Sequence, residues 1–153
     1  DGRAKFVRGW LAAADGRPLT QFTSGDDMIV RMEVESTRTI EKVDLAVVLQ
    51  SMYGMRVITS WTPEVGYVGT IRPGRQVFEC RFKNVKLRPG HTVLVDLWMA
   101  SGAPIDFVER ALVVDVHGDD RHTKLSTAGE QGVVLCDYDW REVPADEPAG
   151  VAP

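Results

Sequence analysis

Short runs of alternating apolar and polar residues, divided by turn residues about every ten positions, constrain this chain more than any other feature. In residues 28–35, Met28, Val30, Met32 and Val34 alternate with Arg31, Glu33 and Glu35 over most of the run. Successive side chains of a strand point to opposite faces, so this run predicts a half-buried antiparallel strand. Few segments have a helical period. The chain is therefore predicted to be all-β.

The alternation predicts about eight or nine short strands, arranged as an immunoglobulin-like or jelly-roll antiparallel β-sandwich. The predicted strands are residues 5–14, 28–35, 43–52, 56–61, 67–71, 76–85, 93–99, 110–117 and 132–136. Residues 103–108 are predicted to be a loop because they include Pro104 and Asp106, and the polar, charged residues 118–131 are predicted to be a loop or at most one helical turn. We expect one domain over residues 1–142 and a frayed tail over residues 143–153.

Charge and hydropathy exclude several partners. The chain has 153 residues and a net charge of -4, and it has no cluster of lysine or arginine. An acidic surface disfavours nucleic acid and anionic membranes as partners. No apolar run approaches the roughly 20 residues that a membrane-spanning helix needs.

Motifs for catalysis or cofactor binding are not found in the sequence. It has no P-loop, no G-x-S-x-G elbow and no H-E-x-x-H pair. His117 and His122 lie near two aspartates, but a solvated loop is favoured over a metal site there. Cys80 and Cys136 are interpreted as reduced thiols, with a disulfide as the alternative. We expect no cofactor and no metal.

The strand over residues 93–99 suggests a binding surface. Alternation places Leu94, Asp96 and Trp98 on the face opposite the apolar Val93 and Val95. An unpaired carboxylate is costly to bury, so the Asp96 face is expected to be solvent-accessible. Trp98 would then offer an apolar plane beside an acid, which suits a sugar ring. The alternative is that Trp98 is a core residue, or that a loop covers it.

In the usual immunoglobulin strand order, the third, seventh and eighth strands are neighbours, so their outward residues would share one surface. Trp61, near the fourth strand, could extend it. The candidate carbohydrate-binding residues are Asp44, Gln50, Trp61, Asp96, Trp98, Asp115 and His117. Glycoside hydrolysis by the aspartates of this set is disfavoured, because nothing marks one of them as having a raised pKa.

Three segments, in their order and spacing, resemble one family. They are FTSGDDM (residues 22–28), LRPG (residues 87–90) and GVVL (residues 132–135) with Trp140 shortly after. The chain is similar in these segments to the C-terminal domain of Wzt-type proteins, the ATP-binding subunits of ABC transporters that export O-antigen polysaccharide. The resemblance spans about residues 4–140.

The resemblance implies a non-catalytic, immunoglobulin-like module that binds O-antigen polysaccharide in the cytoplasm, at the inner face of the inner membrane. It also implies a homodimer, in which the terminal strand over residues 132–136 could exchange between protomers. The nucleotide-binding half would precede residue 1, and the full-length protein would bind the transporter's membrane subunit. Because glycan contacts in the family vary with the sugar, the site residues rest on alternation alone. The alternative function is an immunoglobulin-like domain for protein–protein interaction.

Overall fold

The structure, a computed structural model, describes residues 2–118, 133–134, 140–142 and 144. These residues form ten strands and one short 3-10 helix, and they contain no helix long and apolar enough to cross a membrane. The elements are β1 (Ala4–Ala12), β2 (Pro18–Leu19), β3 (Phe22–Thr23), β4 (Met28–Ser36), β5 (Ile40–Ser51), β6 (Arg56–Trp61), η1 (Thr62–Val65), β7 (Gly69–Ile71), β8 (Gly74–Phe82), β9 (Thr92–Ser101) and β10 (Ala103–His117).

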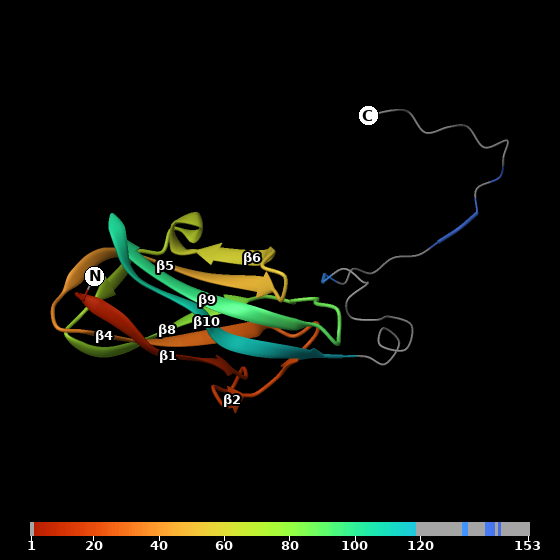
Figure 1. The fold of residues 1–153 in the computed structure, drawn as a ribbon, viewed down its shortest axis with the longest axis horizontal. Coiled ribbons are helices and arrows are strands. Elements are labelled where there is room, and N and C mark those ends of the chain that lie inside the picture. The colour runs from red at the N-terminus through yellow and green to blue at the C-terminus, as the bar shows by residue number, and fades with distance from the viewer. Residues whose placement is uncertain (1, 119–132, 135–139, 143, 145–153) are drawn as a thin grey trace.

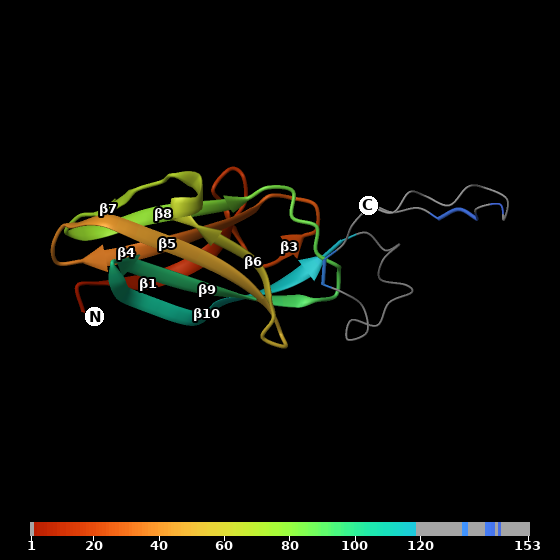
Figure 2. The ribbon, with the colours of Figure 1, turned by 90° about the horizontal axis from the view of Figure 1, so that it is seen from above.

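The strands form two sheets that pack as a sandwich, which confirms the predicted fold class. A four-stranded sheet has the order β2-β1-β4-β8. The other sheet has the order β3-β10-β9-β5-β6, with β7 added beside β5. Pairing is antiparallel except between β3 and β10, which run parallel. In Figures 1 and 2 the strands of both sheets run roughly along the long axis of the molecule.

The core lies between the two sheets and follows the alternation. In β4, the apolar residues predicted to face inward are at most 2% exposed, while Arg31, Glu33 and Glu35 are only half-buried. In β9, Val93, Val95, Leu97 and Met99 are at most 1% exposed. Burial of such side chains stabilises the fold by about 1.5–3 kcal/mol each.

The structure differs from the prediction at residues 103–108, which are not a loop but the first half of β10. Pro104 and Asp106 are tolerated there because the β9–β10 register shifts between them, and a second shift follows between Val108 and Leu112. Bulges of this kind admit residues that a regular ladder would reject. The two-residue strands β2 and β3 were also not predicted; they are too short for alternation to show.

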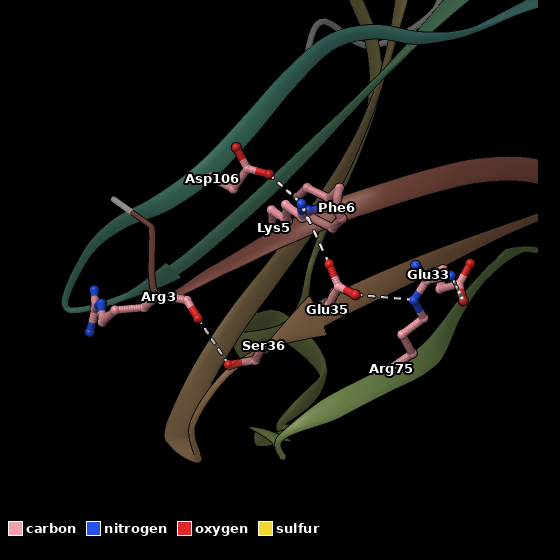
Figure 3. A network of polar contacts seen from close by, with 8 residues as sticks. All are labelled: Arg3, Lys5, Phe6, Glu33, Glu35, Ser36, Arg75 and Asp106. Atoms are coloured by element: carbon pink, nitrogen blue, oxygen red, sulfur yellow. Dashed lines mark hydrogen bonds and ion pairs between the residues drawn. The ribbon is translucent and has the colours of Figure 1, made fainter.

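Figure 3 shows a network of polar contacts around β1, one of which joins the two sheets. The backbone N–H of Phe6 in β1 donates to Asp106 Oδ2 in β10 at 2.8 Å, and thus joins the two sheets. On the outer face of the four-stranded sheet, Glu35 lies 3.5 Å from Lys5 Nζ and accepts from Arg75 Nε at 3.2 Å. The hydrogen bond from Arg75 lowers the pKa of the Glu35 carboxyl.

Residues 133–134 contact the segment before β9. Val134 forms an isolated antiparallel bridge with Leu87, and the Arg88 N–H donates to the Val133 carbonyl oxygen at 2.7 Å. These two residues belong to the strand predicted over residues 132–136, whose other members lie outside the described residues. Cys136, His122, residue 143 and residues 145–153 of the predicted tail also lie outside them.

Candidate functional site

A groove of about 360 Å³ lies on the outward face of the larger sheet, over β5, β6, β9 and β10. The inward face of these strands contributes to the core, so the groove uses only alternate residues of each strand. Its lining residues are Ala46, Val48, Gln50, Arg56, Thr59, Trp61, Glu64, Asp96, Trp98, Phe107 and Glu109.

One row of residues crosses the four strands of the groove. Phe107 of β10 lies opposite Trp98 of β9, Trp98 lies opposite Ala46 of β5, and Ala46 lies opposite Trp61 of β6. Residues directly opposite in a sheet point to the same face, so the three aromatic side chains share this surface. Phe107 is 52% exposed and Trp61 is 41% exposed, while Trp98 is half-buried. The row therefore presents apolar planes that a ligand can reach.

Asp96 lies at the base of the groove but is not solvent-accessible, contrary to the prediction from its charge. The residue is only 3% exposed. Its Oδ1 accepts the backbone N–H of Arg110 at 2.8 Å, and its Oδ2 accepts a hydrogen bond from Gln50 Nε2. The rule that a buried carboxylate needs partners holds here, because the protein itself supplies them.

The partner of Asp96 Oδ1 belongs to the bulge of β10. Val108 lies opposite Leu97 and Leu112 lies opposite Val95, so the three residues 109–111 of β10 lie opposite the single residue Asp96 of β9. Arg110, in the middle of the bulge, has a φ of 53°. A non-glycine residue in the left-handed region is strained, and here the carboxylate of Asp96 fixes it. Asp96 thus holds the bulge that bears Glu109, a lining residue.

Four of the seven predicted site residues line the groove: Gln50, Trp61, Asp96 and Trp98. Trp98 lies on the outward face, as the alternation predicted, and is not a core residue. The strands that carry these residues are neighbours in the order β10-β9-β5-β6, as expected from an immunoglobulin arrangement.

The other three predicted residues do not line the groove. Asp44 lies opposite Ala100, beyond the aromatic row. Asp115 lies opposite Thr92 and accepts a hydrogen bond from its Oγ1 at 2.9 Å, and His117 pairs with Thr23 of β3. Alternation predicted the outward face for all three, but it does not indicate how far the groove extends along the strands.

The candidate set omits seven lining residues: Ala46, Val48, Arg56, Thr59, Glu64, Phe107 and Glu109. Phe107 lies in the segment predicted to be a loop, and Glu109 belongs to a bulge that only the β9–β10 register reveals. Thr59 is separated from Trp61 by one residue in β6, and the same alternation extended to β6 would have found it.

Charges are distributed unevenly along the groove. Its lining contains three acids, Glu64, Asp96 and Glu109, against one base, Arg56. Glu64 of η1 comes three residues after Trp61, at one end of the aromatic row. Glu109 lies two residues from Phe107, at the other end. In the described part of the chain, no group of three or more His, Cys, Asp or Glu side chains could hold a metal ion.

A second hollow, of about 380 Å³, lies at the edge of the sandwich between β8 and the β6–η1 segment. Val65, Tyr67 and Val77 in its lining are 81%, 50% and 53% exposed, so its rim is apolar. Cys80 also lines this hollow and is a free thiol; its burial raises its pKa. Exposed apolar rims of this kind are typical of protein contact surfaces.

Comparison with known proteins bears on both the family and the fold. A sequence model of the family described as the Wzt C-terminal domain matches residues 1–134. A solved structure titled "Crystal structure of the C-terminal domain of wzt" has a similar fold, with a TM-score of 0.72 at 15% sequence identity. That similarity covers 94% of this chain and 86% of that chain. No curated protein matches the chain.

Proposed function

Because the chain belongs to the family of Wzt C-terminal domains, which is a non-catalytic one, we propose that it recognises the polysaccharide of an O-antigen ABC transporter. The aromatic groove over β5, β6, β9 and β10 is the proposed glycan site. In this proposal the domain acts in the cytoplasm, at the inner face of the inner membrane, and the full-length protein binds the transporter's membrane subunit.

The observation that carries the proposal is the row of Trp61, Trp98 and Phe107 on one open sheet face. The C–H face of a pyranose is apolar and packs on an aromatic plane, while its hydroxyls need hydrogen-bond partners at the rim. Gln50, Thr59 and Arg56 supply such groups beside the row. The groove is shallow, so binding at one site is expected to be weak.

Substitution of Trp98 tests the site. Trp98→Ala removes the central plane and is expected to weaken binding of O-polysaccharide from the source cells by about tenfold or more, the effect of losing a central aromatic anchor. Isothermal titration calorimetry measures the affinity. Trp10→Ala is the matched control, because Trp10 stacks with Arg8 on the other sheet, with the Arg8 guanidinium carbon 4.5 Å from the ring centroid. Equal affinity of the Trp98→Ala variant and the unmodified chain would place the glycan elsewhere.

A homodimer would complement weak binding. Two linked sites raise the apparent affinity without new contacts, because the second binding event becomes intramolecular. The apolar hollow between β6 and β8 supports such pairing, since it offers an exposed apolar surface at a sheet edge. Exchange of the terminal strand over residues 132–136 is one way to form the dimer. Light scattering after size exclusion, at micromolar concentration, should give twice the mass of one chain; the mass of a single chain would contradict the dimer.

The same hollow favours a second candidate function, an immunoglobulin-like domain that binds another protein. Val77→Asp places a charge on the hollow's rim, about 53% exposed in the native chain, and leaves the aromatic groove intact. If the hollow serves only dimerisation, this variant becomes monomeric and keeps its single-site glycan affinity. If no glycan binds either form, protein recognition becomes the better description.

A further inference from the structure

We infer that the groove accepts an uncharged stretch of glycan that lies across the strands, with sugar rings over Trp98 and Trp61. This inference rests on the proposed function and adds the direction and the charge class of the ligand. It follows from the register of β5, β6, β9 and β10 and from the positions of the charged lining residues.

The direction follows from the aromatic row. Neighbouring strands are about 4.8 Å apart, so the backbone positions of Trp98 and Trp61, two strands apart, lie about 10 Å from each other. Ala46 lies between the two tryptophans, and its small side chain leaves space between them. Phe107, opposite Trp98, adds one more strand spacing. A glycan that runs across the strands therefore meets each plane in turn, whereas one that runs along β9 would meet only Trp98.

The groove offers little to a chain that runs along the strands. Four residues along β5 from Ala46, the facing residues are Gln50, Leu94 and Val113 rather than aromatic rings. Val113 is 63% exposed but does not line the groove.

The charge class follows from the carboxylates at the two ends of the row. Glu109 lies near Phe107 and Glu64 follows Trp61, and both side chains are exposed. The one base in the lining, Arg56 of β6, lies opposite Gln50 of β5 in the strand register. Gln50 is four residues from Ala46 of the row, which is about 13 Å at the rise of a strand. Among the lining residues, a uronic acid or phosphate over the row would lie nearer to these two carboxylates than to Arg56; the exposed Arg110, next to Glu109, is not part of the lining. Like charges at this range disfavour binding, while an uncharged sugar avoids the repulsion.

A two-part experiment tests the inference. O-polysaccharide from the source cells is cleaved, and its fragments are separated by anion exchange into neutral and acidic fractions. Each fraction is titrated calorimetrically into the chain at 20 and 200 mM NaCl. We expect the neutral fraction to bind at least about tenfold tighter than the acidic one, with an affinity that changes less than about twofold between the two salt concentrations.

Variants test the direction. With fragments of three or more rings, Trp61→Ala is expected to lower affinity about tenfold, and Val113→Ala is expected to leave it unchanged. The double variant Glu64→Gln, Glu109→Gln should bind the acidic fraction more tightly relative to the neutral one than the unmodified chain does.

The other outcomes bear separately on the charge class of the ligand, on its direction and on the proposed function. Tighter binding of the acidic fraction, weakened by salt, would overturn the charge class and leave the proposed function standing. An effect of Val113→Ala without one of Trp61→Ala would overturn the direction. Binding of neither fraction would overturn the proposed function itself, and this inference with it.

Discussion

Asp96 is the residue whose replacement most directly tests the structural account of the groove. Its carboxylate is 3% exposed and accepts hydrogen bonds from the Arg110 N–H and from Gln50. Asp96→Ala removes both acceptors at once. The Arg110 N–H and the half-buried Gln50 amide then lose their partner at the base of the groove.

The expected loss can be bounded from these contacts. A buried polar group left without a partner costs about 1–3 kcal/mol, and two groups are affected. Relief of the desolvation of a buried carboxylate, and entry of water from the open groove, offset part of this cost. We therefore expect a net loss of about 2–4 kcal/mol in the free energy of unfolding. For a domain of this size, that corresponds to a fall in Tm of about 6–12 °C.

Urea unfolding followed by tryptophan fluorescence, with calorimetry for Tm, measures the effect. Asp115→Ala is the matched control, since Asp115 is an exposed acid on the same face, bonded to Thr92 Oγ1. It should change stability by less than about 0.5 kcal/mol. Asp96→Asn keeps one acceptor for the Arg110 N–H and should lie between the two. If Asp96→Ala is as stable as Asp115→Ala, the carboxylate does not hold the bulge and the reasoning is wrong.

Two further predictions concern other parts of the fold. Gly69→Ala should destabilise the chain by about 1–3 kcal/mol in urea unfolding, because the added Cβ would lie 2.9 Å from the Val43 carbonyl oxygen; Thr70→Ala in the same strand is the control, and equal stability of the two variants would count against this steric account. In a Cys136→Ser background, Cys80 should react with iodoacetamide more slowly in the native state than in urea, because burial raises its pKa and disfavours the thiolate. Because the Cys80 thiol has a higher pKa in the native state than in the unfolded state, the free energy of unfolding should not depend on its titration at neutral pH and should fall as pH rises past the pKa of the unfolded thiol. A Cys80→Ser variant whose stability has the same alkaline pH dependence would refute the attribution of this fall to Cys80.

Alternation was sufficient to predict the sandwich and the side-chain orientation of its long strands. The inward residues of β4, the half-buried Phe78, Cys80 and Phe82 of β8, and the buried face of β9 all lie as predicted. The orientation of Trp98 was also correct, because a period of two leaves only two choices and the apolar set selects one.

The burial of Asp96 and the extent of the groove could not be predicted in the same way. Both depend on β10, whose register against β9 shifts twice. The sequence around Pro104 and Asp106 is typical of a loop. It forms a strand because pairing with β9, and the hydrogen bond that the Phe6 N–H donates to Asp106, stabilise it. Such tertiary contacts leave no periodic signal, so Phe107 and Glu109 were missed for the same reason.

The division of β9 into a buried and an outward face bears on how such domains diverge. Val93, Val95, Leu97 and Met99 are constrained by the core, whereas Trp98, two strands from Trp61, contacts the groove. The outward positions can therefore change one at a time, with little effect on the packing between the sheets. The similar fold of a solved Wzt C-terminal domain at 15% sequence identity is consistent with a scaffold that keeps its packing while most of its side chains change.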